Sequence, residues 1–329
     1  MRRRIWCETV PTRELGGARV IELLRRFAVT PIVAVWPATR AEASEAIAAL
    51  DAQGLSPAVW PMLDDADGRW LGAANAARFA RFVEALAEDL APREIVLDLE
   101  PPIEALRAGL ASAAVSAHLL PPGADPAAHR AARQALAALV DQLHARGVQV
   151  SAAVAPPVLA HEAWEARLGT PVSGVAWDHL SPMLYTSIIE GWSRGALGRA
   201  DTRALFAASC LASAARFGER AGASLGAVGT GAFGDEPVYR SPADLADDVA
   251  IARAAGLDDL ALFDLGGVLR RAPAEAWLEA FVSTPAAPSL PEPTPRSRAA
   301  VAAMRAAGAA LGALAHARRF MERPLVTRR

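Results

Sequence analysis

The sequence predicts a (β/α)8 barrel, in which eight parallel strands alternate with helices around a central core. Eight short apolar runs recur over about 250 residues with helical patterns between them, which matches the size and rhythm of such barrels. Most of the runs are continuously apolar, as is typical of strands that are covered on both faces. An open doubly wound sheet normally has a glycine-rich turn after its first strand, and residues 8–12 (Glu-Thr-Val-Pro-Thr) lack one.

The strands follow one another at regular intervals. They are predicted at Ile5–Val10, Pro31–Trp36, Ala58–Leu63, Glu94–Leu99, Val148–Val154, His179–Tyr185, Ser224–Gly229 and Asp259–Asp264. Between them, apolar residues recur at i, i+3, i+4 and i+7, the spacing of one helix face. Clear examples are the sets Val20, Leu23, Leu24, Phe27 and Leu136, Leu139, Val140, Leu143. Gly54 and Gly147 follow two of these helices, where a left-handed residue commonly ends a helix.

Three regions are expected along the chain. Residues 1–283 form the barrel, 284–297 form a linker rich in Pro, Ala and Ser, and 298–329 form an Ala/Arg-rich helix. We expect residues 298–321 to pack on the barrel or on a partner helix, with a membrane-surface helix as the second interpretation. No run approaches about 18 uninterrupted apolar residues, so we expect no transmembrane segment.

Composition excludes several classes of protein. The 34 basic and 36 acidic residues give a net charge of −2, which does not favour a nucleic-acid binder. Lysine is absent, which excludes Schiff-base enzymes, P-loop nucleotide-binding proteins and protein kinases. Cys7 and Cys210 are too few for a disulfide framework or a structural zinc site. The N-terminal residues lack a signal-peptide pattern, so we expect a cytoplasmic protein, or an exported one if a leader has been removed.

Chemistry in such barrels lies at the carboxyl ends of the strands. The polar and aromatic residues at these ends are Glu8, Trp36, Trp60, Asp64, Asp98, Glu100, Tyr185 and Asp264. No histidine stands among them, so a histidine metal site or a Ser-His-Asp triad lacks its parts. We therefore predict neither a metal nor a cofactor.

The segment Glu94–Pro102 is the most informative. Because strand residues alternate between faces, Asp98 and Glu100 should point together into the barrel mouth. Two neighbouring carboxyl groups raise one pKa, which can keep a carboxyl protonated for general-acid chemistry. The structural alternative is that Asp98 caps the following loop and Glu100 pairs with an arginine.

Two motifs resemble those of family 18 glycoside hydrolases, the chitinase-like barrels. Asp98-Leu-Glu100 is similar to the end of that family's Asp-x-x-Asp-x-Asp-x-Glu signature in strand four. In the sixth strand, Asp178, Met183 and Tyr185 keep the family's spacing of an Asp, a Met five residues later and a Tyr seven residues later. The resemblance covers about residues 3–283, over a barrel-wide pattern.

The resemblance implies a substrate-assisted hydrolase. Glu100 would be the general acid that protonates the glycosidic oxygen, and Asp98 would orient the substrate's 2-acetamido group. Tyr185 would hydrogen-bond the acetamido carbonyl as that oxygen attacks C1, a departure from the scheme with two enzyme carboxylates. Four positions depart from the family pattern. Arg93 and Val96 replace earlier signature acids, Thr186 stands where the family usually has Asp or Asn, and Asp264 replaces the aromatic residue that ends strand eight.

Tryptophans are a second indication of a carbohydrate ligand. Eight Trp against two Tyr is unusual, and several lie at strand ends or in the following loops. Indole rings stack on the apolar faces of sugars, although any single Trp is as well explained as a core residue. The predicted binding residues are Trp36, Trp60, Asp64, Trp70, Met183, Trp192, Asp264 and Glu8.

The function therefore has three readings. The first is a glycoside hydrolase acting on an N-acetylated or related glycan, and the second is the same barrel binding a carbohydrate without cleaving it. The third is a phosphoester enzyme in which Glu8, Asp64, Asp98, Glu100 and Asp264 hold Mg²⁺. All three predict a site at the carboxyl ends of the strands.

Overall fold

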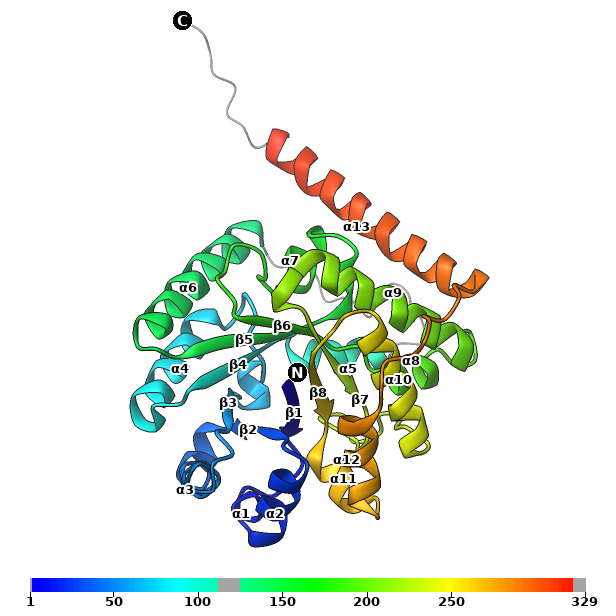
Figure 1. The fold of residues 1–329 in the computed structure, drawn as a ribbon. Helices are drawn as coiled ribbons and strands as arrows, with labels where there is room; N and C mark the ends of the chain where they lie inside the picture. The colour runs from blue at the N-terminus through cyan, green and yellow to red at the C-terminus, as the bar shows by residue number, and fades with distance from the viewer. Residues whose placement is uncertain (1, 112–124, 322–329) are drawn as a thin grey trace, which may run out of the picture.

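The computed structural model describes residues 2–111 and 125–321. Eight parallel strands form a nearly closed barrel with helices around it (Figure 1), which confirms the predicted (β/α)8 fold. An additional C-terminal helix follows the barrel, as expected. The predicted end of that helix, residues 322–329, lies outside the described residues.

The strands run in one continuous hydrogen-bonded order, β6-β5-β4-β3-β2-β1-β8-β7. Two parallel bridges between the outermost strands, Leu180–Ala221 and Met183–Ser224, bring the ring close to closure. The strands are β1 (Arg2–Cys7), β2 (Thr30–Val35), β3 (Ala58–Pro61), β4 (Glu94–Leu99), β5 (Gln149–Val154), β6 (His179–Pro182), β7 (Gly222–Gly226) and β8 (Asp259–Phe263).

The helices cover the outside of the barrel. They are α1 (Thr12–Leu15), α2 (Ala18–Arg26), α3 (Arg40–Ala52), α4 (Ala76–Leu90), α5 (Ile103–Ala111), α6 (Pro126–Ala145), α7 (Ala163–Leu168), α8 (Thr186–Trp192), α9 (Arg199–Phe217), α10 (Pro242–Ala254), α11 (Leu265–Arg270), α12 (Ala274–Ser283) and α13 (Pro295–Met321). Gly54 and Gly147 have φ of 77° and 76°, so both predicted left-handed helix ends are confirmed.

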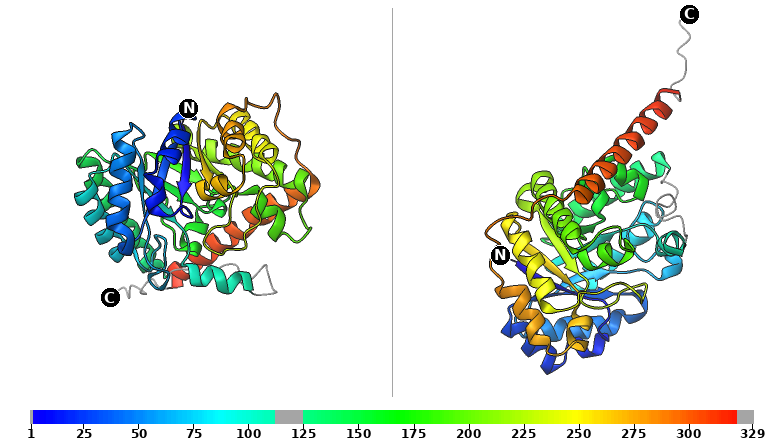
Figure 2. Two further views of the ribbon diagram at one scale, coloured as in Figure 1. Left: turned by 90° about the horizontal axis from the view of Figure 1, so that it is seen from below. Right: turned by 90° about the vertical axis from the view of Figure 1, so that its right-hand side faces the viewer.

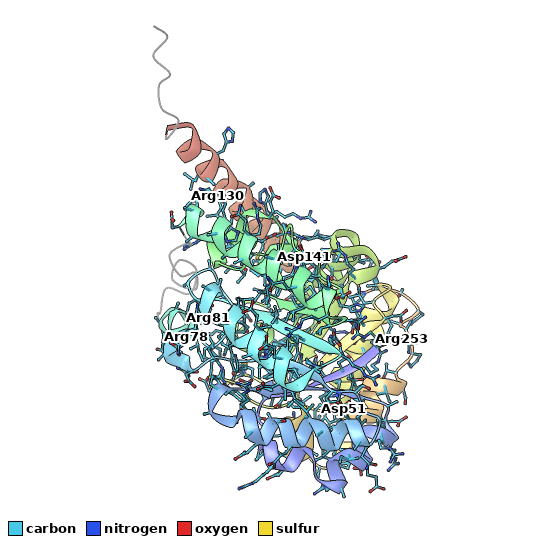
Figure 3. All side chains as sticks on the ribbon, turned by 90° about the vertical axis from the view of Figure 1, so that its left-hand side faces the viewer. Asp51, Arg78, Arg81, Arg130, Asp141 and Arg253 are labelled. Atoms are coloured by element: carbon cyan, nitrogen blue, oxygen red, sulfur yellow. The ribbon has the colours of Figure 1, made fainter. Side chains whose placement is uncertain are left out.

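Two apolar layers hold the barrel together. Strand residues that point outward, such as Val33 and Leu97, pack with the helices in the larger layer. Their neighbours Ile32 and Val96 point inward and fill the interior, because successive side chains alternate between faces. Charged side chains cover the outer helices, including the residues labelled in Figure 3: Asp51, Arg78, Arg81, Arg130, Asp141 and Arg253.

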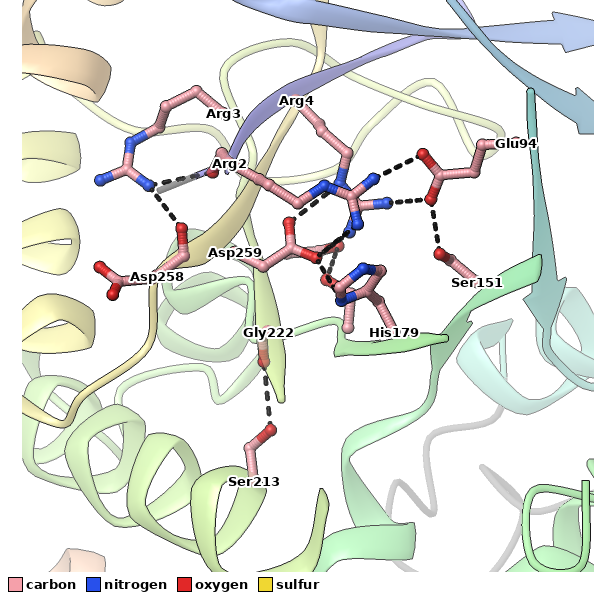
Figure 4. A network of polar contacts seen from close by, with 12 residues as sticks. Arg2, Arg3, Arg4, Glu94, Ser151, His179, Ser213, Gly222, Asp258 and Asp259 are labelled. Carbon is pink, nitrogen blue, oxygen red and sulfur yellow. Dashed lines mark hydrogen bonds and ion pairs between the residues drawn. The ribbon is translucent and has the colours of Figure 1, made fainter. Parts of the chain in front are cut away.

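The first strand begins earlier than predicted. It spans Arg2–Cys7 rather than Ile5–Val10, so three arginines belong to a strand that we expected to be apolar. The guanidinium groups of Arg2 and Arg4 find carboxylate partners at the amino-terminal end of the barrel, and that of Arg3 donates to the backbone carbonyl oxygens of Arg2 and Asp258 (Figure 4). These contacts allow a charged segment to join the sheet. An apolarity criterion cannot recognise a strand of this kind.

Arg4 is the centre of this network and is only 2% exposed. Its Nε and Nη2 atoms donate to the two carboxylate oxygens of Asp259, at 3.0 and 2.8 Å. Its Nη1 donates to Glu94 Oε1 at 3.1 Å, and the Ser151 hydroxyl donates to the same oxygen at 2.5 Å. The network joins β1, β4, β5 and β8 across the base of the barrel (Figure 4).

Other predicted strand ends shift for local reasons. β6 ends at Pro182 rather than Tyr185, and Tyr185 is the N-cap residue of helix α8. β7 spans Gly222–Gly226 rather than Ser224–Gly229. Its start depends on Gly222, where a Cβ atom would lie 2.7 Å from the carbonyl oxygen of Asp259 on β8.

Helix α13 begins at Pro295, three residues before the predicted start. The Thr294 hydroxyl oxygen accepts a hydrogen bond from Ser297 N at 3.0 Å, which caps the first turn. Met304 and Leu311 pack against the outer apolar layer, and Trp164 Nε1 of α7 donates to Met304 O at 3.2 Å. The helix therefore packs on the barrel in its first half, and Figure 2 shows its last turns extending beyond it.

The described part of α13 also bears on the expected absence of a transmembrane segment. Within the described residues, Pro295–Ala317 is long and apolar enough to cross a membrane, by length and composition only. The count of uninterrupted apolar residues does not find this segment, because Arg296, Arg298 and Arg305 interrupt it.

The base network yields a stability prediction. Arg4→Ala is expected to lower the free energy of unfolding by about 3–5 kcal/mol, because Glu94 and Asp259 would stay buried without their central cation. Urea denaturation at pH 7 measures the effect. Arg81→Ala on the exposed face of α4 is the matched control, with an expected change within about 0.5 kcal/mol. Equal losses in the two variants would contradict the role given to Arg4.

Candidate active site

A cavity of about 280 Å³ opens at the carboxyl ends of the strands. Eight of the predicted site residues line it: Glu8, Trp60, Trp70, Asp98, Glu100, Met183, Tyr185 and Trp192. The other lining residues are mostly apolar or aromatic: Trp6, Leu106, Ala155, Pro156, Ile188, Ile189, Ala232, Phe233, Glu236 and Phe263. The cavity is thus a largely apolar chamber that contains a few carboxyl groups.

Strand β4 and the prolines after it place the first two carboxyl groups. Val96 and Asp98 share the inward face, and Glu100 continues that alternation just beyond the strand. Glu100 precedes Pro101, and a residue before proline is confined to extended conformations. The chain therefore leaves the strand without turning into a helix at once, and Glu100 lines the cavity beside Asp98.

Tyr185 enters from the end of β6, two strands along the ring from β4. Its ring lies 5.6 Å from the ring of Phe263, between centroids. Gly226 makes room for it, because a Cβ atom there would lie 2.9 Å from Tyr185 Cδ1. Phe263 also supplies an aromatic surface at the end of β8. We expected Asp264, the next residue, at this place.

Further aromatic side chains form the cavity wall. Trp6 and Trp60 meet edge to face at 4.6 Å, deep in the barrel. Trp192, the last residue of α8, and Phe233, on the loop after β7, form a second edge-to-face pair at 6.0 Å. Such pairs hold each ring at a defined angle, so the wall has a fixed shape.

Three predicted binding residues lie elsewhere. Asp264 is buried and caps helix α11, where it accepts hydrogen bonds from Gly267 N at 2.9 Å and from the Thr9 hydroxyl at 2.6 Å. Asp64 is exposed and does not line the cavity. Trp36 lines a neighbouring open hollow, which Glu8 also lines, so Glu8 lies between the two.

Glu8 is bound to Arg69, a residue that sequence analysis did not single out. Arg69 Nη2 donates to Glu8 Oε1 at 2.5 Å, and Nη1 donates to Asp65 Oδ1 at 2.7 Å. Asp65 also accepts from Arg107 Nη1 of α5 at 2.9 Å. A chain of alternating charges therefore runs from the cavity edge to the surface.

Asn75, the only asparagine of the chain, holds the loop that carries Arg69 and Trp70. Its Nδ2 atom donates to Asp67 O at 2.9 Å and to Trp70 O at 2.8 Å. Its Oδ1 atom accepts from Gly72 N at 2.9 Å. The side-chain amide thus satisfies three backbone groups and fixes the loop beside the cavity.

The carboxyl groups of Asp98 and Glu100 resist ionisation. Burial, reinforced by the negative charge of Glu8 and opposed by Arg69, raises the pKa of Glu100 from 4.5 to about 8. Burial and the charges of Glu100 and Glu8 raise the pKa of Asp98 well above its usual value. Burial also raises the pKa of Tyr185, so its phenol remains a hydrogen-bond donor.

Three buried polar atoms around the cavity have no hydrogen-bond partner among the described residues. They are Asp98 Oδ1, Trp60 Nε1 and Glu236 Oε2. Val96, on the same strand face as Asp98, offers it no polar group. A buried polar atom without a partner is costly, so these atoms indicate a place for polar groups of a ligand.

The acids at the strand ends do not gather around one point. Within residues 2–111 and 125–321, no group of three His, Cys, Asp or Glu side chains is arranged to hold a metal ion. Glu8 is paired with Arg69, Asp64 is exposed and Asp264 is engaged as a helix cap. The ring of carboxylates required for the Mg²⁺ hypothesis is therefore not formed.

The site residues that were missed fall into two kinds. Trp6 and Phe263 lie on strands, and the strand alternation that placed Asp98 could have placed them too. Arg69 and Glu236 lie on loops, where no periodicity indicates which side chain turns inward. Glu236 Oε1 accepts from Phe233 N at 2.9 Å, a contact within one loop that nothing in the sequence pattern announces.

No protein-family model and no curated protein sequence matches this chain. Among solved structures, the catalytic domain of a family GH18 chitinase from the fern Peteris ryukyuensis matches with TM-score 0.54 and 13% identity, over 86% of this chain and 99% of that one. The PgaB (BpsB) glycoside hydrolase domain from Bordetella bronchiseptica matches with TM-score 0.51 and 14% identity, over 85% and 99%.

A chitinase catalytic domain from Pyrococcus furiosus matches with TM-score 0.50 and 10% identity, over 86% of this chain and 95% of that chain. At identities of 10–14%, such likeness establishes the shared fold alone. The chain thus has the barrel fold of these glycoside hydrolase domains.

The raised pKa of Glu100 predicts a pH-dependent gain in stability from Glu100→Gln. Wild-type protein loses stability as pH rises from the unfolded pKa near 4.5 to the folded pKa near 8, because the buried carboxyl must ionise. The free energy of unfolding of the variant should therefore exceed that of wild type by an increment that grows over this pH range and then stays constant. Urea denaturation from pH 4 to 9 measures it.

Glu104→Gln makes the same chemical change at an exposed position on α5 and is the matched control. Its free energy of unfolding should stay close to that of wild type at every pH, because exposed ion pairs contribute little. A pH-independent effect of Glu100→Gln would mean that Glu100 ionises normally.

Proposed function

We propose that this barrel is a glycoside hydrolase that favours an N-acetylated glycan and uses Glu100 as its general acid. The observation that carries the proposal is the meeting of Glu100, Asp98 and Tyr185 in one aromatic-lined cavity. The raised pKa of Glu100, about 8, supports it, because a general acid must hold its proton near neutral pH.

In this reaction the Glu100 carboxyl gives its proton to the glycosidic oxygen as the bond to C1 breaks. The substrate's acetamido carbonyl oxygen attacks C1, so no second enzyme carboxylate is needed as nucleophile. Asp98 orients the acetamido N–H group, and the Tyr185 hydroxyl donates to the acetamido carbonyl. Water then opens the cyclic intermediate, with the Glu100 carboxylate accepting its proton.

The chamber suits a sugar ring. Flat faces of Trp60, Trp70 and Trp192 offer stacking surfaces for the apolar face of a pyranose. The volume of about 280 Å³ is near the lower end of small-molecule sites, roughly 300–1,000 Å³, which favours one enclosed ring over a long enclosed chain.

A barrel that binds a carbohydrate without cleaving it is the second candidate. The three unpartnered polar atoms, Asp98 Oδ1, Trp60 Nε1 and Glu236 Oε2, favour a hydroxyl-rich ligand whatever becomes of it. The binder and the hydrolase differ only in whether Glu100 transfers its proton.

Glu100→Gln is expected to reduce turnover of chito-oligosaccharides by about 10²- to 10⁴-fold, because the amide cannot supply the proton. Binding of the same oligosaccharides, measured by calorimetry, should persist in the variant. Glu104→Gln, at the exposed position on α5, should retain wild-type turnover. Wild-type binding without any turnover would favour the binder, and wild-type turnover in Glu100→Gln would remove Glu100 as the acid.

The pH profile gives a further test. Activity is expected to fall as pH rises through about 8, because Glu100 is then deprotonated and cannot act as an acid. Initial rates at substrate concentrations well below KM, from pH 3.5 to 10, measure this basic limb, because kcat/KM reports ionisation of the free enzyme. A limb near pH 4.5, the ordinary carboxyl value, would show that the cavity does not hold the proton on Glu100.

A further inference from the structure

Arg69 reaches the cavity edge from a strained turn. It follows Gly68, which has φ of 95°, and is itself left-handed with φ of 60°. A left-handed conformation costs a residue other than glycine about 1–2 kcal/mol. The turn holds it there, because Arg69 O accepts from Leu63 N at 2.8 Å. Strain of this kind persists where the surrounding structure requires one side-chain position, and it is common at functional sites.

The guanidinium group is held through its two Nη atoms and against two indole rings, whereas its buried Nε has no hydrogen-bond partner among the described residues. It binds Glu8 and Asp65 through Nη2 and Nη1, at 2.5 and 2.7 Å. It also lies 5.9 Å from the ring of Trp36 and 5.7 Å from that of Trp70. The Glu8 side chain is 6% exposed and that of Arg69 14%, so solvent screens this pair little.

Charged and titratable groups face the Glu8–Glu100 region from every element around the mouth. They are Glu8 after β1, Asp65 and Arg69 after β3, Asp98 and Glu100 at β4, Arg107 on α5, Tyr185 after β6, Glu236 after β7 and Asp264 after β8. In the described part of the chain, Arg69 is the cation that pairs with a carboxyl lining the cavity. One cation thus serves a cavity with several acids.

We propose that Arg69 and Glu8 form a positioning pair that keeps Glu8 ionised and thereby holds the cavity's proton on Glu100. The proposal rests on the proposed function of Glu100 and gives Glu8 a role other than contact with substrate. Burial raises the pKa of Glu8 too, but the charge and the hydrogen bond of Arg69 oppose that rise. Among neighbouring carboxyl groups, the one bonded to a guanidinium ionises first. Its fixed negative charge then opposes ionisation of Glu100 and of Asp98 beside it.

The pair predicts an order for the pKa of Glu100 in three proteins. Glu8→Gln removes the negative charge of Glu8 and leaves Arg69 paired with Asp65 alone, so the pKa should fall by about 1 unit or more. Glu8→Gln/Arg69→Met removes both charges, so the pKa should recover most of that fall. Wild type should remain highest, because the Glu8 charge acts on Glu100 more strongly than the opposing charge of Arg69.

The experiment measures the stability increment of Glu100→Gln against pH in each of these three backgrounds. The pH at which the increment stops growing reports the folded-state pKa of Glu100 without requiring activity. Asp65→Asn is the matched control, because it removes the other carboxylate of Arg69 on the side away from the cavity. In the Asp65→Asn background, the increment should stop growing near the same pH as in wild type. Near-ultraviolet circular dichroism verifies that each background is folded.

The proposal is supported if the increment stops growing at the lowest pH in the Glu8→Gln background and at a higher pH in the double variant. It is overturned if the increment stops growing at the same pH in the Glu8→Gln background as in wild type. It is also overturned if the double variant gives the same low pH as Glu8→Gln. Where substrate turnover is found, the basic limb of the pH profile should shift in the same order. Shifted stability curves with no turnover of any glycan would refute the proposed function and leave the charge pair standing.

Discussion

An apolar barrel interior tolerates a charge only where it is paired or where the ionisable group stays neutral. At the base, Arg4 meets Glu94 and Asp259, and the network is closed by the hydroxyl of Ser151. At the mouth the balance is different, because several carboxyl groups line a chamber in which Arg69 is paired with one of them. The base therefore serves stability, and the mouth has the chemical character of a site.

The mouth depends on restraints that lie outside the cavity. Asn75 fixes the loop that presents Arg69 and Trp70, and Pro101 keeps Glu100 extended. Gly226 leaves space for the ring of Tyr185. Groups that must act on one substrate atom need such support, because small displacements remove catalysis.

Much of the fold was predictable from the sequence, because buried parallel strands leave long apolar runs that are easily counted. The predicted bounds of β4 match the structure residue for residue, and alternation from that strand placed Asp98 and Glu100 at the mouth together. β1 was misplaced because Arg2 and Arg4 join the sheet through ion pairs, which apolarity does not reveal.

Parts of the site could not be read from the sequence. Arg69 and Glu236 turn inward from loops, and loop conformation depends on individual hydrogen bonds such as those of Asn75. Asp264 has the residue type and position expected of a binding group, yet its carboxylate caps α11. Telling a capping carboxylate from a binding one requires knowing which backbone N–H groups face it.

The central claim is that Glu100 carries a proton at neutral pH inside this chamber. Infrared spectroscopy tests it directly, because a protonated carboxyl has a C=O stretch that is separate from the bands of carboxylates. Wild-type protein at pH 7 should show such a band, which should weaken in Glu100→Gln and disappear as pH rises well above 8. A spectrum at pH 7 that is free of protonated carboxyl, or a band that Glu100→Gln leaves unchanged, would contradict the account.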